Sequence, residues 1–546
     1  MSHAYRLQIM LSILGSAVVA LLIAVVAYGS GSAAVPATGG AYVEGMVGQP
    51  QVLNPLLAKP TDYPAQSIDS LIFSGLTRED STGLPQPDLA RSWAITNDGK
   101  TYTFYLRPNI TWQDGQPFTA DDVLYTLRTI QSPTFSGDPD LASAWRGAQI
   151  TKLDTLTVQV ILPQPFAPIL DYASAGILPA HLLSQTSPAA LSSSTFNRQP
   201  VGTGPYRLLR ADLNSVVLEA YPGYYAAKPY ISRLMLRFYE TDQAVVQAVL
   251  DGQVEGDWHV TASDAAKLQR DGRLTFYEAV QPSYSGLAFN MNDGMLSQTP
   301  VRQAIAYAID REKLRAQLLH GAAQLADSPI APNSWAYDPT TPQYTYDPAR
   351  AASLLFNAGW QKAGGAWAKN GALLAPELVS DDSPDHVDMA RAIAQQLRTF
   401  GLGVSLKIVP FNTLLTSYLA PRKFQIALLD WDQGSGDPDP YALWHSSQAT
   451  PDGLNFSSWK SPMADAALAN GRKTTDLAAR KKAYAIFQQA FATDLPAFLL
   501  FHPVYEYAVD DSIHGVTLPS VIHPEDRFAT LNRWYIQTRP AKASSR

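Results

Sequence analysis

Alternating apolar and polar residues mark a short strand early in the chain. Tyr102, Phe104 and Leu106 alternate with more polar neighbours, which is the two-residue period of a strand with one buried face. Residues 97–99 (Asn-Asp-Gly), just before it, are a hairpin turn signal. The pattern therefore predicts a turn followed by a half-buried strand.

Apolar residues recur at helical spacing in three later segments. Thr119 and Asp122 have the spacing of a capping box, so the first helix is expected to start after Thr119. The second is predicted over 347–359, with Asp347 as its cap and a glycine at its end. The third is expected to run from near residue 388 to Gly401.

Two predicted strands follow these helices, at residues 404–408 and 424–429. The first alternates, and the second is a continuous apolar run of the kind found in buried strands. Strand–helix–strand order predicts βαβ units and hence an α/β lobe.

The N-terminus is a targeting segment. An uncharged run from Ile9 to Tyr28 follows His3 and Arg6. A spanning helix needs roughly 20 residues, whereas the apolar part of a signal peptide usually has about 7–15. We favour an uncleaved anchor, with a cleaved signal peptide as the alternative. In both cases Arg6 stays on the inner side of the membrane and the body of the protein lies outside.

Length and composition exclude several classes of function. A chain of 546 residues is too long for one core, so two or three lobes are expected. A net charge of −7 with no basic stripe argues against nucleic acid. The absence of cysteine excludes disulfides, thiolate nucleophiles, cysteine-bound zinc and a lipid-modified N-terminal cysteine.

The predicted strand at 424–429 is followed by residues that could bind a ligand. Trp431 follows it, among the carboxylates of Asp430, Asp432, Asp437 and Asp439. Ligands of open α/β sheets bind beyond the carboxyl ends of the strands, so a ligand-binding cleft is expected at this edge of the sheet. The alternative is an ordinary strand exit built from turn-forming residues.

A series of motifs along the body occurs in an order and spacing that resemble one known family. They are Leu89-Ala-Arg-Ser-Trp93, the segment 98–107, Trp112-Gln-Asp-Gly115, Thr119-Ala-Asp-Asp-Val123, Val201-Gly-Thr-Gly-Pro-Tyr206, the segment 301–313, Ser328–Trp335, Tyr346-Asp-Pro348 and Leu495-Pro496. The chain resembles the family 5 extracellular solute-binding proteins, the oligopeptide and dipeptide binding components of ATP-binding-cassette importers. The resemblance covers about residues 42–516.

The resemblance implies an α/β, two-lobed, clamp-like fold of the type II periplasmic binding proteins, with an extra inserted domain and a preceding N-terminal apolar helix. By that analogy residues 1–40 are anchor or signal peptide plus linker, lobe I is 41–75, 200–275 and 505–536, the inserted domain is 76–199, lobe II is 276–504, and 537–546 is a flexible tail. Residues 277–284 and 502–507 would be the hinge strands.

The family also implies which positions line the pocket. They are Trp431, Asp432, Gly434, Asp437, Tyr284, Asn54, Tyr63 and Ser380. Peptide-binding members place an Asp for the ligand amine where Gly434 stands here on a gapless reading, so Asp432 or Asp437 would have to substitute. A turn role for Asp437 is the alternative.

Dipeptide-binding members hold the ligand carboxylate with an Arg where this chain has Ser380, Asp381 and Asp382. A carboxylate facing these acids would be repelled. The sequence therefore disfavours a free dipeptide and favours a cationic, neutral or polyhydroxylated solute, or a longer peptide. Trp431→Ala is expected to weaken binding with little loss of fold.

We expect a monomeric, extracytoplasmic capture protein, without catalysis, cofactor or metal. Its partners would be a small or oligopeptide ligand, a membrane permease of an ATP-binding-cassette importer, and the membrane itself through residues 9–28. A ligand sensor for a membrane signalling partner is the alternative. A hydrolase is disfavoured, because the sequence has no His-Glu-x-x-His, Gly-x-Ser-x-Gly or P-loop, and His386 has no identified partner.

Overall fold

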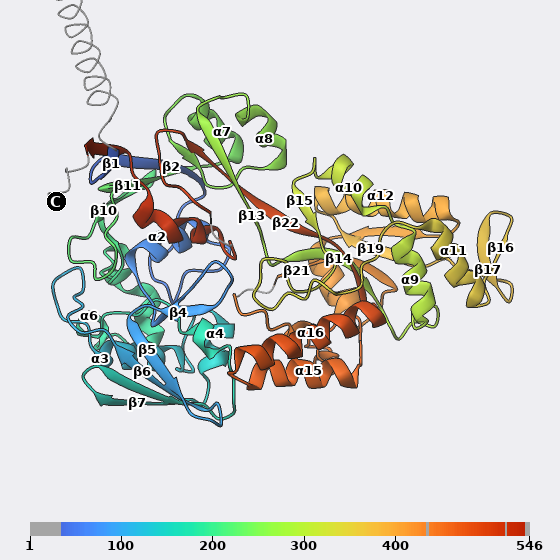
Figure 1. Ribbon diagram of the computed structural model, residues 1–546, viewed down its shortest axis with the longest axis horizontal. Coiled ribbons are helices and arrows are strands. Elements are labelled where there is room, and N and C mark those ends of the chain that lie inside the picture. The colour runs from blue at the N-terminus through green and yellow to red at the C-terminus, as the bar shows by residue number, and fades with distance from the viewer. Residues whose placement is uncertain (1–33, 433–435, 519–520, 541–546) are drawn as a thin grey trace, which may run out of the picture.

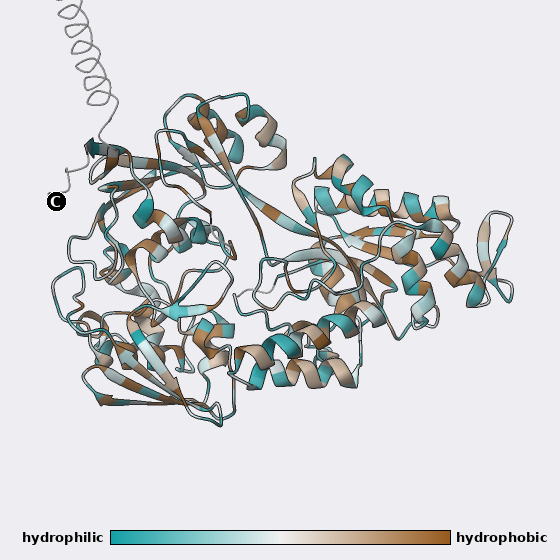
Figure 2. Ribbon diagram, viewed as in Figure 1, coloured by the Kyte–Doolittle hydropathy of each residue, from teal (hydrophilic) through white to brown (hydrophobic). Residues whose placement is uncertain are grey.

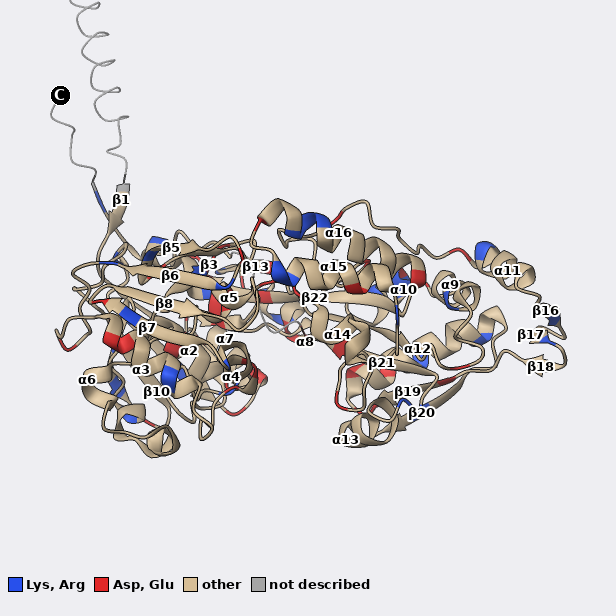
Figure 3. Ribbon diagram, turned by 90° about the horizontal axis from the view of Figure 1, so that it is seen from below, with Lys and Arg blue, Asp and Glu red and all other residues tan. Residues whose placement is uncertain are grey.

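Two lobes of mixed helix and strand are joined by one long strand, β22 (Ala497–Asp510), in the computed structural model (Figure 1). The structure describes residues 34–432, 436–518 and 521–540. Residues 497–501 of β22 pair with β14 of one lobe, and residues 504–510 pair with β13 of the other. Figure 3 shows the same connection from a second direction.

Lobe I is built on a sheet in which β2 pairs in parallel with β11 and β12. Its elements are β2 (Ala41–Val47), α2 (Tyr63–Ile72), β9 (Tyr206–Ala211), β10 (Ser215–Ala220), β11 (Arg233–Tyr239), α7 (Asp242–Leu250), β12 (Gly256–Asp257), α8 (Ala262–Leu268), β13 (Leu274–Val280) and the 3-10 helix η5 (Pro524–Arg533).

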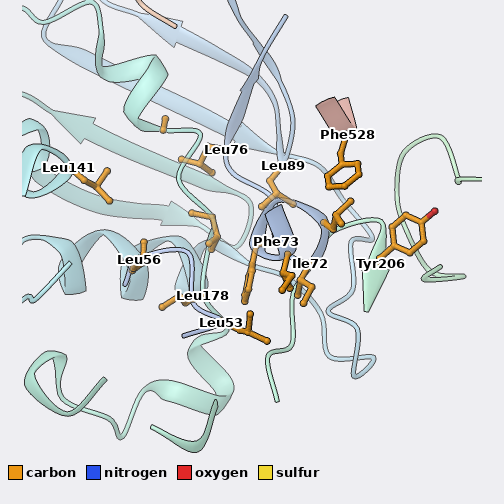
Figure 4. Close-up of a cluster of buried hydrophobic side chains, with 14 of the residues drawn as sticks. Leu53, Leu56, Ile72, Phe73, Leu76, Leu89, Leu141, Leu178, Tyr206 and Phe528 are labelled. Carbon is orange, nitrogen blue, oxygen red and sulfur yellow. The ribbon is translucent and has the colours of Figure 1, made fainter. Parts of the chain in front are cut away.

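An inserted domain packs below lobe I in Figure 1. Its elements are β3 (Thr77–Glu79), β4 (Pro85–Pro87), β5 (Ala90–Ile95), β6 (Thr101–Leu106), α3 (Ala120–Ile130), α4 (Pro139–Trp145), β7 (Gln149–Asp154), β8 (Thr157–Ile161), α5 (Ile169–Tyr172), α6 (Ala180–Leu183), η1 (Pro188–Ser193) and η2 (Thr195–Arg198). One continuous hydrophobic core joins it to lobe I. Figure 4 shows this junction, where Leu53 and Ile72 lie near Leu89.

Lobe II carries a sheet in which β19 lies in parallel between β20 and β21. Its elements are β14 (Tyr284–Phe289), α9 (Thr299–Tyr307), α10 (Arg311–Leu318), β15 (Ala323–Leu325), α11 (Pro348–Asn357), β16 (Gln361–Ala363), β17 (Ala366–Lys369), β18 (Ala372–Leu373), β19 (Glu377–Asp381), α12 (Pro384–Phe400), β20 (Ser405–Val409), α13 (Phe411–Thr413), the π-helix η3 (Leu414–Leu419), β21 (Ile426–Trp431), α14 (Tyr441–Trp444), η4 (Ser446–Gln448), α15 (Pro462–Lys473) and α16 (Leu477–Asp494).

Local sequence patterns place several of these elements. Every second residue of β6 is buried, as the alternation predicts. Helix α3 begins with a complete capping box between Thr119 and Asp122. Helix α12 ends at Gly401, whose φ of 110° is in the left-handed region that glycine tolerates. Figure 2 shows hydrophobic residues along strands of both lobes and mixed faces on α15 and α16.

Some boundaries differ from the prediction. Helix α12 begins at Pro384 rather than near residue 388, because a proline fits the first turn of a helix. Strand β21 begins and ends two residues later than predicted. Residues 34–37 (β1) and 537–540 (β23), assigned to a linker and a flexible tail, pair as antiparallel strands. These two segments meet only in the folded lobe, so no local sequence pattern predicts their pairing.

The apolar helix predicted at residues 9–28 lies outside the described residues. Within the described part of the chain, no helix combines the length and the apolarity that crossing a membrane requires.

Candidate ligand-binding cleft

The parallel strands of lobe II bring polar residues to one edge of its sheet. Strand β19 ends at Asp381, and β21 ends at Trp431 after Asp430. Helix α12 begins three residues after β19. Carboxyl ends of parallel strands meet at one edge, which is the usual ligand side of such sheets. Figure 3 shows acidic residues in this region.

Trp431 lies in an aromatic stack. Its ring centroid is 5.5 Å from that of Tyr284 and 5.5 Å from that of Trp444. The indole nitrogen of Trp444 donates a hydrogen bond of 3.0 Å to the hydroxyl of Tyr284. Trp431 is 4% exposed and Tyr284 is fully buried. The stack therefore holds the end of β21 rigidly against β14.

His386 supplies a cation that sequence reasoning missed. Its Nδ1 contacts the carboxylate of Asp381, and its Nε2 lies 3.1 Å from Oδ2 of Asp430. Burial alone disfavours the imidazolium, but the hydrogen bonds and charges of Asp430 and Asp381 raise the pKa of His386 to about 9. This corrects the prediction that Asp381 has no cation and His386 no partner. The three residues meet only because β19 and β21 are neighbours.

Replacing His386 by Gln is expected to lower the free energy of unfolding by about 1–2 kcal/mol near pH 6, a modest value because Asp430 is mostly exposed. Because the folded state raises the pKa from 6.5 to about 9, this stabilisation is full below pH 6.5 and disappears as pH rises through 9. Urea unfolding of both proteins at pH 6 and pH 10 measures it. A difference that is equal at the two pH values would contradict the assignment.

The loop after β21 is anchored by ion pairs. Asp437 is buried, and its Oδ1 lies 2.7 Å from Nη2 of Arg480 on α16. Asp439 pairs with Arg472 at 2.6 Å. Asp432 is exposed, and Gly434 lies outside the described residues. Of the predicted acids, Asp430 and Asp432 are therefore open to solvent, whereas Asp437 holds the loop to α16.

The other predicted residues lie at different depths. Asn54 is fully buried, and its Nδ2 donates a hydrogen bond of 3.0 Å to Oδ1 of Asn197. Ser380 is also fully buried, in β19. Tyr63, at the start of α2, is 38% exposed and packs 5.3 Å from Trp258. The structure thus leaves Tyr63 accessible and places Asn54 in the core.

The inserted domain reaches across to lobe II. The backbone N–H of Trp335 donates a hydrogen bond of 3.3 Å to the carbonyl of Thr82, between β3 and β4. Glu79 at the end of β3 approaches the loop after β21 so closely that a Cβ on Gly436 would lie 1.8 Å from its carboxylate. The inserted domain and lobe II are therefore in direct contact here.

A cavity of about 800 Å³ lies between lobe I and the inserted domain. Residues of α2, the β3–β4 region, α5 and η5 line it, among them Asp69, Glu79, Asp171, Glu525 and Asp526. No motif in the sequence singled out these five acids. Across residues 34–432, 436–518 and 521–540, no group of three or more metal-ligating side chains is arranged to hold a metal ion.

Comparison with known proteins identifies the family. The family model described as bacterial extracellular solute-binding proteins, family 5 Middle, matches residues 85–452, and the chain belongs to this family. Its members bind solutes, in agreement with the expectation from the motifs.

Particular relatives cover nearly the whole chain. The chain is 28% identical over 506 residues to the dipeptide-binding protein of Escherichia coli (strain K12), covering 86% of this chain and 90% of that protein. The structure of the oligopeptide-binding protein AppA from Bacillus subtilis in complex with a nonapeptide matches with a TM-score of 0.67 at 26% identity, covering 92% of this chain and all of that one.

A third match is the crystal structure of NikZ from Campylobacter jejuni in complex with Ni(L-His), with a TM-score of 0.70 at 26% identity. It covers 91% of this chain and 99% of that chain. These similarities confirm the predicted two-lobed fold of mixed helix and strand.

Proposed function

We propose that this protein captures a peptide or another small solute between its lobes and delivers it to an ATP-binding-cassette permease. The observation that carries the proposal is that the loop after β21 of lobe II meets Glu79 of the inserted domain, in a molecule whose two lobes are joined through β22. The names of the relatives favour peptides. The proposal also includes other small solutes, because NikZ was solved in complex with Ni(L-His), which is not a peptide.

Capture would use a hinge at the point where β22 passes from one sheet to the other. Residues 281–283 connect β13 to β14 beside this point, and His502 there contacts the carbonyl of Ser283 at 2.9 Å. The solute would favour closure because it contacts both lobes at once. The proposed ligand-side residues remain Trp431, Asp432, Gly434, Asp437, Tyr284, Asn54, Tyr63 and Ser380. The proposed domains also remain, except that β13 (Leu274–Val280) belongs with lobe I, where it pairs with β22, and residues 537–540 form a strand with β1.

We also propose that residues 9–28 hold the protein at the outer face of the cytoplasmic membrane. The length and lack of charge of this segment support the proposal. A capture protein held beside its permease needs no diffusion through the surrounding medium to reach it.

A crosslink across the seam tests capture by lobe movement. The chain has no cysteine, so Thr82→Cys and Trp335→Cys together introduce one possible disulfide, at a position where the two backbones already share a hydrogen bond. Because a solute enters and leaves only when the lobes separate, oxidation is expected to slow peptide association at least about 10-fold. Stopped-flow tryptophan fluorescence with a tripeptide library measures the rate, and recovered peptides should be intact.

Reduction of the same sample is expected to restore the rate, and each single-cysteine variant is the matched control. Binding at an unchanged rate in the oxidised double variant would contradict capture between the lobes. Hydrolysed peptides would contradict a role without catalysis.

A further inference from the structure

The cavity between lobe I and the inserted domain has an excess of acidic side chains. Seven carboxylates line it, against three arginines and one histidine. The acids are Asp69, Glu79, Asp88, Asp138, Asp171, Glu525 and Asp526, and the bases are Arg78, Arg107, Arg533 and His523. They come from segments far apart in sequence, so the excess is a property of the folded cavity.

The charges are unevenly distributed. Arg107 donates a hydrogen bond from Nε to the carbonyl of Asp88, and Arg78 and Arg107 both act electrostatically on the Asp88 carboxylate. Elsewhere in the lining, Glu79 faces Asp171 and Asp526, and both His523 and Arg527 act electrostatically on Glu525 and Asp526. The lining contributed by α2, α5 and η5 therefore contains more acidic than basic side chains.

Asp69 is the clearest sign that a ligand belongs there. It lines the cavity and is only 3% exposed, yet no hydrogen bond of normal length and angle reaches either carboxylate oxygen from the described residues, and the backbone N–H of Asn54 is the one donor that acts on it. Likewise, no hydrogen bond of normal length and angle from the described residues reaches Oε2 of Glu525. Burying a carboxylate with so few donors is unfavourable for folding, so such a group is retained where it acts on something else.

We propose that this cavity is a subsite for a cationic group of the captured solute, an ammonium or guanidinium, and that Asp69, Glu79 and Glu525 hold it. The inference rests on the proposed capture function and names the chemistry of its substrate. The cavity is of the size that small organic ligands occupy. Tyr172, Tyr224, Tyr225 and Phe528 also line it, and aromatic faces attract organic cations.

The electrostatic environment of two of these acids agrees with this assignment. Burial, and next the charge of Asp62, raise the pKa of Asp69 well above its usual value, against a smaller opposing effect of the backbone N–H of Asn54. Burial and then the charge of Asp171 do the same for Glu79. A bound cation would oppose both shifts, because a neighbouring positive charge favours the carboxylate form.

Calorimetry on the full chain with three matched tripeptides tests the proposal. The central residue is lysine, uncharged norleucine or glutamate, between alanines. The lysine peptide is expected to bind at least about 10-fold more tightly than the norleucine peptide. Pentane-1,5-diamine is expected to bind, and pentane-1,5-diol is not.

Asp69→Asn and Glu525→Gln are each expected to abolish the preference for lysine while raising the melting temperature of the unliganded protein. A purely structural role would not move affinity and stability in opposite directions. Asp121→Asn removes the same charge from an exposed pair with Lys152 and is expected to keep the preference. Should one cavity variant fail to fold, the other decides.

Equal affinity for the three peptides, with no binding of the diamine, would overturn the cation subsite and leave peptide capture intact. Binding of the diamine alone, lost in Asp69→Asn, would support the subsite and overturn peptide capture. A preference for lysine that survives both cavity variants would also overturn the assignment.

Discussion

Replacing Arg527 by Met is expected to lower the free energy of unfolding by about 3–5 kcal/mol, since it leaves a buried charge without its partner. Arg527 and Glu44 are both fully buried. The guanidinium donates to Glu44, to Oγ of Ser67 at 3.1 Å and to the carbonyl of Pro524 at 2.6 Å. It therefore ties β2, α2 and η5 together at the centre of lobe I.

Urea unfolding of the variant measures this loss. Arg533→Met is the matched control on the same 3-10 helix, where the residue is exposed, and is expected to change stability by less than about 0.5 kcal/mol. The double variant with Glu44→Gln should recover part of the loss, because the uncompensated charge is gone. A single variant as stable as the parent protein would contradict the role of this ion pair.

Replacing Trp431 by Ala is expected to lower the free energy of unfolding by about 3–5 kcal/mol, the usual range for deleting a large buried aromatic side chain. The sequence predicted little loss of fold. The structure corrects this expectation, because Trp431 is 4% exposed and stacks between Tyr284 and Trp444. A variant with reduced affinity would thus report on the shape of the cleft as well as on direct contact.

Trp431→Phe is the informative companion, since it keeps an aromatic ring in the stack and should retain most of the stability. Thermal unfolding and peptide titration of both variants distinguish the two roles. If Trp431→Ala unfolds with the same free energy as the parent protein, the stack does not stabilise lobe II.

Local patterns predicted much of lobe II. The cap at Asp347 and the glycine at 401 depend on residues within one or two helical turns, and both are where the sequence placed them. The position of Trp431 and Asp430 at the end of a buried strand also followed from a local run of apolar residues. The start of α12 was misjudged because polar residues in its first turn carry no apolar period.

The contacts of the candidate site were not predictable in the same way. His386 meets Asp430 across 44 positions of the sequence, and Asp69 of α2 shares a cavity with Glu525 of η5. No spacing rule links such residues. Their meeting depends on strand order and on the return of the chain to lobe I through β22.

The amino-acid sequence alone determined the family, the α/β class and the places where strands, caps and turns begin, because these depend on neighbours a few residues apart. Only the tertiary structure decided which carboxylates face a cavity and which are neutralised, since burial and charge pairing arise when distant segments pack. For that reason Asp437 is held by Arg480, whereas Asp69 lines a cavity without a side-chain hydrogen-bond donor among the described residues.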